Sequence, residues 1–215
     1  RSVDQRAIDD YGMSGLVLME NAGRGAAAII AEVAPSGDIL ILCGRGNNAG
    51  DGYVIARHLE LMGRTARIAS LVPLESLQGD ALANARIAQA AQIACDYIDE
   101  SAALGPLLGS ASTIVECLLG TGARGAPRDL MGDAVRLANE LDATRIAIDV
   151  PAGLDCDTGE PSEPALHADH TISFVAAKVG FLQPSAASFV GQIHTVGIGV
   201  PKKLLDEVVR LSRQS

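Results

Sequence analysis

The sequence predicts an α/β protein built on a mainly parallel β-sheet that helices cover on both faces. Apolar runs of strand length alternate with helix-length segments along most of the chain. These strand candidates are apolar throughout, which is typical of strands buried on both faces of a parallel sheet. No repeat, low-complexity tract or linker interrupts the 215 residues. We therefore expect a single domain that spans residues 1–215.

The N-terminal segment predicts two helices before the first strand. Val3–Tyr11 is a short helix ended by Gly12. Ser14 is placed to cap a longer, alanine-rich helix over Leu16–Val33, because a serine side chain accepts a hydrogen bond from a backbone N–H of the first turn.

Strands and helices alternate in the remainder of the chain. The predicted strands are Ile39–Cys43, Thr65–Leu71, a short Cys95–Ile98, Ser112–Val115, Arg145–Val150, Thr171–Val175 and Gln192–Val196. The predicted helices are Gly52–Met62, Ala81–Gln92, Ala102–Leu108, Leu130–Leu141 and Lys202–Ser212. The last two strands are joined by a connection that contains Gly and Ser.

Composition excludes several classes of protein. Hydrophobic residues make up 48% and aromatic residues 3%, so the core is built from Ala, Val, Leu and Ile, and intrinsic disorder is excluded. A formal charge of −9 argues against a nucleic-acid partner, although backbone N–H groups can still hold the phosphate of a nucleotide. No apolar run is long enough to cross a bilayer, and no signal peptide is visible in a chain that begins with Arg1. We expect no membrane partner.

The spacing of the cysteines and histidines along the chain fits no known pattern of metal ligands. Cys43, Cys95, Cys117 and Cys156 lie among apolar or small residues, which predicts buried free thiols, a reducing compartment and a cytoplasmic location. The histidines are His58, His167, His170 and His194, and we expect them to be structural or exposed.

A glycine-rich segment, GRGNNAGDG over residues 44–52, follows the first predicted strand and precedes a helix. Such a turn lets backbone N–H groups approach a phosphate. The segment lacks the Lys-Ser/Thr of a P-loop and departs from the usual dinucleotide fingerprint. Asn47 and Asn48 add amide groups that suit a ligand or a cation. The alternative is a tight turn with an Asn/Asp helix cap.

Two further strand ends carry acidic residues. Glu116 precedes a second glycine-rich turn, and Asp149 ends the strand RIAIDV. Because parallel strands end at a common edge, we expect Asn48, Glu116 and Asp149 to share one rim of the sheet. In the second turn, Arg124 suits a phosphate; the alternative is a surface loop with solvated charges.

Lys178 interrupts the apolar stretch FVAAKVGF. It either extends to the surface or pairs with an acid in the site. Asp155 and Asp157, followed by Gly159, are predicted to form a structural turn.

The order of these segments resembles that of the YjeF N-terminal domain family, the NAD(P)H-hydrate epimerases. The matching blocks are LVLMENAGR, GRGNNAGDGYVIARHL, ECLLGTGARG, AIDVPAGLDCDTG and ADHTISFVAAKVGFL. The resemblance extends from about Val3 to Pro201, and the combined order of the blocks is highly specific.

The resemblance implies a Rossmann-like three-layer αβα sandwich, typically a homodimer. It also implies an isomerase that interconverts the R and S forms of hydrated NADH and NADPH, which carry a hydroxyl at carbon 6 of the nicotinamide ring. A partner NAD(P)H-hydrate dehydratase then repairs the S form. Because the chain ends soon after its last predicted helix, we expect a free-standing protein.

The resemblance also assigns roles to individual residues. The substrate would be bound by Asn47, Asn48, Ala49, Gly50, Asp51, Gly120, Thr121, Gly122, Ala123, Arg124, Gly125, Ala126 and Asp149. One potassium ion per subunit would be held by Asn48, Glu116 and Ala152. The family usually has Asp at position 116 and Ser at position 152, so only the backbone carbonyl of Ala152 is available to the ion.

The chemistry requires a proton donor that later becomes an acceptor. The ring nitrogen can expel the hydroxyl, and water can return to either face of the resulting cation. We expect Asp149 to be the catalytic acid/base, with Lys178 as its charge partner or as an alternative proton donor. For Asp149 to act as a proton donor at neutral pH, burial must raise its pKa. A nearby Lys178 would lower that pKa instead.

Two other functions fit parts of the sequence. The first is a non-catalytic scaffold of the same fold that binds a nucleotide or a partner chain. The second is an ordinary NAD-dependent dehydrogenase, for which an acidic residue about 20 positions after the glycine-rich turn is expected. That region holds Gly63, Arg64 and Thr65 and no acid, which disfavours the dehydrogenase.

Overall fold

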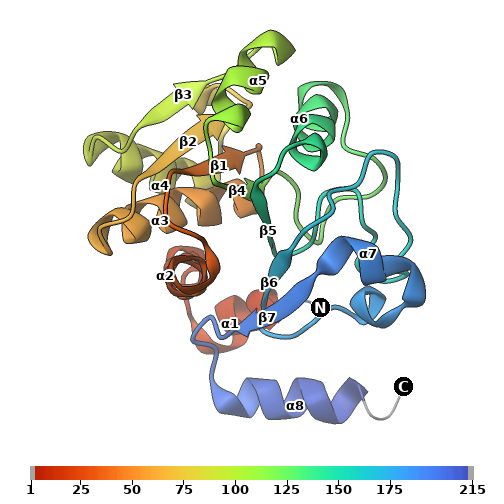
Figure 1. The fold of residues 1–215 in the computed structure, drawn as a ribbon. Helices are drawn as coiled ribbons and strands as arrows, with labels where there is room; N and C mark the ends of the chain where they lie inside the picture. Colours follow the sequence, from red (N-terminus) through yellow and green to blue (C-terminus); the bar gives the residue numbers. More distant parts are fainter. Residues whose placement is uncertain (1–2, 213–215) are drawn as a thin grey trace.

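The computed structural model describes residues 3–212 and contains the predicted strands and helices in the predicted order (Figure 1). The strands are β1 (Ile39–Cys43), β2 (Ala66–Ser70), β3 (Cys95–Tyr97), β4 (Thr113–Cys117), β5 (Thr144–Ile148), β6 (His170–Phe174) and β7 (Gln192–Val196). The helices are α1 (Val3–Tyr11), α2 (Gly15–Val33), α3 (Asn47–Leu61), α4 (Gly79–Ala90), α5 (Ser101–Gly109), α6 (Asp129–Glu140), α7 (Ala187–Val190) and α8 (Lys202–Ser212).

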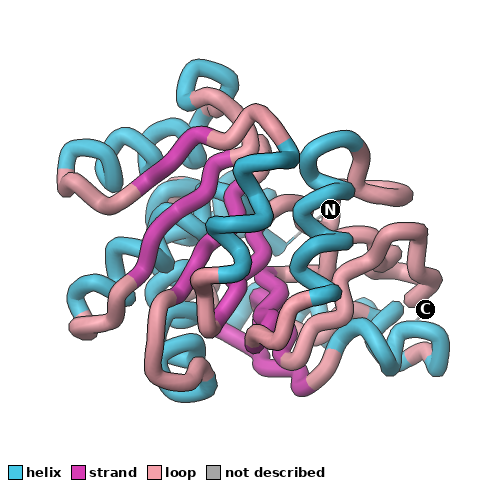
Figure 2. Tube along the Cα trace, turned by 45° about the horizontal axis from the view of Figure 1, so that its top comes forward, coloured by secondary structure: helices cyan, strands magenta, loops and turns pink. Residues whose placement is uncertain are grey.

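All seven strands belong to one parallel sheet in the order β3-β2-β1-β4-β5-β6-β7. The chain starts at β1 in the middle, builds outward to β3, and then crosses back to continue from β4 to β7. Figure 2 shows the strands side by side with helices on both sides of the sheet. The predicted three-layer α/β architecture is confirmed.

Most predicted boundaries are shifted slightly, and Asp149 follows β5 instead of ending it, because β5 stops at Ile148. Three further differences concern α3, β4 and the connection between β6 and β7. Helix α3 begins at Asn47 rather than at Gly52, so most of the first glycine-rich segment is helical rather than a turn. Strand β4 continues to Cys117, which places Glu116 inside the strand. The connection between β6 and β7 contains two 3₁₀ turns, Val179–Leu182 and Pro184–Ala186, and the short helix α7.

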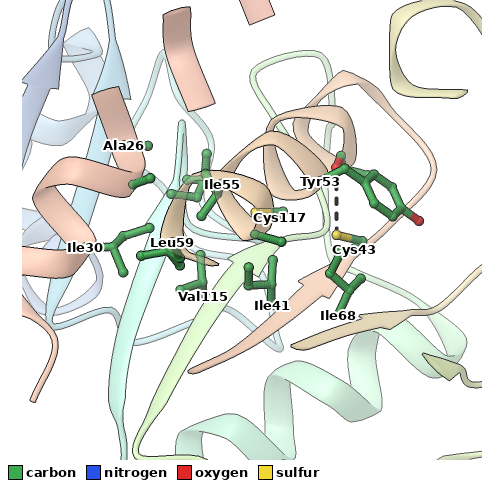
Figure 3. Close-up of a cluster of buried hydrophobic side chains, with 14 of the residues drawn as sticks. Ala26, Ile30, Ile41, Cys43, Tyr53, Ile55, Leu59, Ile68, Val115 and Cys117 are labelled. Carbon is green, nitrogen blue, oxygen red and sulfur yellow. Dashed lines mark hydrogen bonds between the residues drawn. The ribbon is translucent and has the colours of Figure 1, made fainter. Parts of the chain in front are cut away.

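Alternate residues of the central strands face different layers of helices. Ile39 and Ile41 of β1 belong to a buried cluster with residues of α2, α3 and α4 (Figure 3). Leu40 and Leu42 belong to a second cluster with residues of α5 and α6. Each central strand is therefore buried on both faces, which explains why its sequence is apolar throughout.

The two ends of the described chain pack together. Helices α1 and α8 share a smaller apolar cluster that includes Ala7 and Leu204. The guanidinium of Arg6 pairs with the carboxylate of Glu207 at 2.5 Å, and Figure 1 shows α8 beside α1. This packing holds α1 against the edge of the sheet where the candidate site lies. Ser14 caps α2 as predicted, since its hydroxyl accepts a hydrogen bond from the Val17 N–H at 3.3 Å.

The thiol prediction is correct for two of the four cysteines. Cys43 and Cys117 are buried, and all four cysteines are free thiols. Cys95 is exposed because it lies on β3, the edge strand, and Cys156 is partly exposed on a loop. Within residues 3–212, no helix has both the length and the apolar character needed to cross a membrane.

Candidate functional site

The segments that follow β1, β4, β5 and β6 surround a cavity of about 640 Å³, which we call the switch-point cavity. Its walls are residues 45–48 and Asp51, residues 118–123, Asp149, residues 174–175 and Lys178, with Val3 and Asp4 of α1 and Met131 of α6. The cavity lies where the strand order reverses between β1 and β4. Open α/β sheets bind their ligands at this position.

Asn48 is in the first turn of α3 and is 6% exposed. Its amide nitrogen donates hydrogen bonds to the carbonyl oxygens of Leu119 at 2.7 Å and Ile148 at 3.0 Å. Asn48 thereby links α3 to the segments that follow β4 and β5. Its Oδ1 atom is buried and has no hydrogen-bond partner within residues 3–212. A buried acceptor of this kind is suited to a cation or to a donor group of a ligand.

Glu116 is fully buried beneath the cavity and does not line it, so only two of the three predicted rim residues face the cavity. Its Oε1 accepts the backbone N–H of Leu118 at 2.7 Å, and its Oε2 accepts that of Ala152 at 2.9 Å. Burial raises the pKa of Glu116 to about 7, although the hydrogen bonds from the backbone oppose the shift. The side chain fixes the loop after β4 against the loop after β5.

Asp149 and Lys178 form an ion pair inside the cavity. Lys178 Nζ is 2.8 Å from Asp149 Oδ1, and the two side chains are 19% and 14% exposed. Asp149 Oδ2 also accepts the backbone N–H of Thr121 at 3.2 Å, and Lys178 Nζ donates to the Phe174 carbonyl at 3.3 Å. Of the two alternatives for Lys178, the pairing with an acid is confirmed.

The backbone at the ends of β5 and β6 is in an uncommon conformation. Asp149 has φ 68° and Val175 has φ 67°, both in the left-handed region that favours glycine. Both residues line the cavity. Non-glycine residues in such conformations are concentrated at functional sites, where the surrounding structure holds them.

Two additional carboxyl groups face the same cavity. Asp51 is 8% exposed, and within residues 3–212 its carboxyl has no cationic partner. Burial raises the pKa of Asp51 well above its usual value, and the charges of Asp149 and Asp4 raise it further. Partial desolvation and the charge of Asp149 also raise the pKa of Asp4, while Lys178 opposes this shift. The cavity therefore combines an ion pair with two carboxyl groups whose pKa values are raised.

Arg124 has both halves of its guanidinium engaged away from the cavity. Nη1 is 2.6 Å from Asp155 Oδ2, and Nη2 is 2.7 Å from Asp157 Oδ2. Asp155 Oδ1 also accepts the backbone N–H groups of Asp157 and Thr158, each at 2.9 Å, which confirms the predicted turn. Arg124 is thus part of a loop contact, and it does not line the cavity.

The remaining predicted residues divide into two groups. Asn47, Gly120, Thr121, Gly122 and Ala123 line the cavity. Four others do not line it: Ala49, Gly50, Gly125 and Ala126. Ala49 and Gly50 are buried in α3, and a Cβ atom at Gly50 would lie 2.5 Å from Met19 Sδ. Gly50 is therefore required for helix packing rather than for a turn.

The oxygen atoms around the cavity are the groups that could hold a cation. Within residues 3–212, no three His, Cys, Asp or Glu side chains are grouped to hold a metal ion. Asn48 Oδ1 is free, while the oxygens of Glu116 each accept a backbone N–H. The Ala152 carbonyl accepts the Leu166 N–H at 2.9 Å.

The sequence analysis did not find several residues of the cavity wall. Asp4 comes from α1, far from the glycine-rich segments, and only the packing of α1 with α8 brings it to the site. Met131 and Phe174 lie inside a predicted helix and a predicted strand and were not assigned to the site. Arg45 lies inside the first motif and was overlooked, although a basic residue between two glycines at a strand end is a visible signal.

The fold and the site together define an α/β protein with a ligand cavity at the topological switch point of a parallel sheet. The family model described as "YjeF-related protein N-terminus" matches residues 15–180. The chain therefore belongs to the YjeF-related N-terminal family.

Curated relatives cover nearly the whole chain. A protein of Rhodopirellula baltica named NAD(P)H-hydrate epimerase is 48% identical over 95% of this chain and 84% of its own length. A Pirellula staleyi protein of the same name is 38% identical over 97% of this chain and 93% of its own length. A Pyrobaculum aerophilum protein named bifunctional NAD(P)H-hydrate repair enzyme is 40% identical over 93% of this chain and 40% of its own length.

A solved structure is similar in fold. The crystal structure of yeast ynu0 superimposes with a TM-score of 0.75, covering 90% of this chain and 83% of the yeast chain at 22% identity. At that identity the likeness supports the fold alone.

Proposed function

We propose that this chain is an NAD(P)H-hydrate epimerase, an isomerase that equilibrates the R and S forms of hydrated NADH and NADPH. The observation that carries the proposal is the Asp149–Lys178 ion pair inside a cavity at the switch point of the sheet. The named activity of the two relatives that match almost end to end supports the same assignment.

The reaction needs two functions from the protein: proton transfer to and from oxygen, and stabilisation of the positive charge that develops on the ring. The carbon that carries the hydroxyl is bonded to the ring nitrogen, whose lone pair expels the hydroxyl and leaves an iminium-like cation. Protonation lets the hydroxyl leave as water. A water molecule then adds to either face of the ring and gives up a proton, so the reaction consumes no proton overall.

The Asp149–Lys178 pair supplies both functions. The Asp149 carboxylate lies 2.8 Å from the Lys178 ammonium, and its negative charge would stabilise the developing cation. The pair as a unit gives one proton to the departing hydroxyl and recovers it from the attacking water. General acid–base catalysis of this kind contributes about 10²–10⁴-fold.

Two segments would bind the rest of the substrate. The first is the start of α3, with Asn47, Asn48 and Asp51, and the second is the turn at residues 120–123. Both segments border the switch-point cavity from adjacent strands, and both bring backbone groups close to the cavity. Asp51 is the buried acidic group of the first segment, and burial raises its pKa well above the usual value.

Potassium fits the oxygen donors at this position in part. Asn48 Oδ1 is a buried acceptor without a partner in the described chain, and Glu116 supplies a buried carboxyl nearby in the fold. Asn48 and Glu116 would hold one ion per subunit, with the Ala152 carbonyl as a weaker ligand because it already accepts the Leu166 N–H. When bound, the ion would supply positive charge next to a ligand that carries phosphates. A higher melting temperature in potassium chloride than in equimolar lithium chloride tests this assignment.

Three further properties belong to the same proposal. We expect a homodimer, and exposed apolar residues at the start of α2, Leu16 and Val17, give it a candidate surface. We expect the S form to pass to an NAD(P)H-hydrate dehydratase, since the Pyrobaculum relative is named as a bifunctional repair enzyme. Four free thiols favour a reducing, cytoplasmic environment.

The alternative function is a scaffold that binds a nucleotide or a partner chain without catalysis. Purified R-hydrate incubated with the protein and followed by chromatography separates the two. An epimerase brings the R form to equilibrium with the S form much faster than buffer does. A rate equal to that in buffer would leave only the scaffold.

A further inference from the structure

Three basic side chains lie near the switch-point cavity, and two of them already have anionic partners. Lys178 pairs with Asp149, and Arg124 pairs with Asp155 and Asp157. Arg45 lines the cavity, is exposed, and has no hydrogen bond or ion pair with any residue in the described range 3–212. Among the described residues, Arg45 is therefore the cation lining this cavity that remains available to a ligand.

The position of Arg45 adds a second favourable feature. It directly precedes Gly46, the N-cap of α3, and Gly46 provides no side chain to cap the helix. Within residues 3–212, no acceptor meets the backbone N–H groups of Asn47 and Asn48. A guanidinium and two free N–H groups of a helix N-terminus are thus adjacent in the chain, and both favour an anion.

The cavity also holds acidic groups. Asp4 and Asp51 line it, and the negative charge of Asp149 raises the pKa of both. A phosphate is repelled by the Asp149 carboxylate and attracted by the Arg45 guanidinium, so the anionic part of a dinucleotide belongs beside Arg45 at the start of α3.

We infer that Arg45 binds a phosphate group of the dinucleotide substrate and, together with the start of α3, orients the nicotinamide ring toward Asp149. The inference rests on the proposed function and deepens it, because it names the residue that recognises the charged part of the substrate. The arginine expected for this role from the sequence was Arg124, whose guanidinium is occupied by two carboxylates.

Equilibrium binding tests the inference without relying on catalysis. Isothermal titration of ADP-ribose, which carries the pyrophosphate, is compared with titration of 2′-phospho-ADP-ribose. Arg45→Gln is expected to weaken binding by about tenfold to a hundredfold, the effect of losing a charge-assisted hydrogen bond. Arg45→Lys keeps the charge and loses the fork of donors, so an intermediate loss is expected.

Arg86→Gln is the matched control, because Arg86 is an exposed arginine of α4 that does not line the cavity. It makes the same change in net charge and should leave binding within about twofold. Circular dichroism of each variant verifies the fold. In kinetics with the hydrate, Arg45→Gln should raise KM and also lower kcat, because a phosphate that is held less well positions the nicotinamide ring less precisely against Asp149.

The two ligands identify which phosphate is bound. Equal losses for both ligands point to the pyrophosphate, and a loss for the 2′-phosphorylated ligand alone points to the 2′-phosphate. Unchanged binding of both ligands, or no binding by the unsubstituted protein, overturns the inference. Weakened binding in a protein that does not equilibrate the hydrate would refute the epimerase proposal and keep the role of Arg45. Normal epimerisation with an unchanged KM in Arg45→Gln would refute the role of Arg45 and keep the epimerase proposal.

Discussion

Asn48 performs two separate tasks with one side chain. Its amide nitrogen joins the carbonyls of Leu119 and Ile148, and its amide oxygen is left free in a buried position. The nitrogen therefore stabilises the site, and the oxygen is available to a ligand. Asparagine can do this because it carries a donor and an acceptor on one rigid plane.

Asn48→Ala should lower the free energy of unfolding by about 2 kcal/mol, because the buried carbonyl of Ile148 and the partly buried carbonyl of Leu119 lose their donor. Asn47→Ala is the control, since Asn47 is the preceding residue of the same type and is exposed. Urea unfolding of both variants measures the difference. Equal stability of the two variants would mean that the contacts of Asn48 contribute nothing to the fold.

The sequence indicates most of the site residues but not their surroundings. Asp149 and Lys178 could be proposed from their motifs, yet their contact at 2.8 Å depends on how the segment after β6 folds back. Glu116 was expected on the rim and is instead buried below it, because β4 extends to Cys117. Strand length is decided by pairing with the neighbouring strands, which a single sequence does not contain.

At the scale of elements, helix α3 determines the shape of the site. Its glycine-rich start suggested a turn, but Gly50 and Gly52 are helical. A Cβ atom at Gly52 would lie 2.7 Å from Cys43 Sγ and 3.1 Å from Cys117 Sγ. The glycines therefore let the helix lie close to the sheet, and this need overrides their poor helix propensity.

Gly52→Ala should destabilise the protein by about 1–3 kcal/mol, since overpacking outweighs the gain in helix propensity. Gly109→Ala in α5 is the control, because a Cβ atom there meets nothing within 4 Å. That variant should be more stable by up to about 1 kcal/mol. Thermal unfolding of both variants tests the pair, and a stabilised Gly52→Ala would contradict the packing explanation.

The strands β6 and β7 carry a contact that depends on pH. His170 Nδ1 lies 3.1 Å from His194 Nε2, so one ring must accept the proton of the other. Burial lowers the pKa of His170 from its ordinary 6.5, and the charge of His194 lowers it further, against the opposing charge of Asp169. When the pH falls below the ordinary pKa of 6.5, His170 binds a proton more readily in the unfolded chain than in the folded protein. The free energy of unfolding therefore decreases as the pH falls.

His170→Gln should therefore flatten the decline of stability between about pH 7.5 and about pH 5.5. Urea unfolding at both pH values, in the variant and in the unsubstituted protein, measures the two slopes. Identical slopes would show that the histidine pair makes no contribution to the acid sensitivity of the protein.

At the scale of the whole molecule, the parallel sheet is the feature that the sequence predicts best. Strands that are apolar on both faces leave few other architectures. The order of the seven strands, with the reversal between β1 and β4, comes from the structure alone. The cavity is less predictable, because its wall combines α1 with loops that come much later in the chain. Contacts between distant segments, such as those of α1 with α8, leave no local pattern in the sequence.

The central claim is that the Asp149 carboxylate takes part in the chemistry of the hydrate. The direct test is the rate at which purified R-hydrate reaches equilibrium, followed by chromatography, in Asp149→Asn and in Asp206→Asn. Asp206 is an exposed residue of α8 that pairs with Lys202 alone in the described range, so it controls for the lost charge. We predict a rate lower by about 10²–10⁴-fold in Asp149→Asn, with ADP-ribose binding retained, and an unchanged rate in Asp206→Asn. An Asp149→Asn protein that folds and equilibrates the hydrate at the unsubstituted rate would contradict the account.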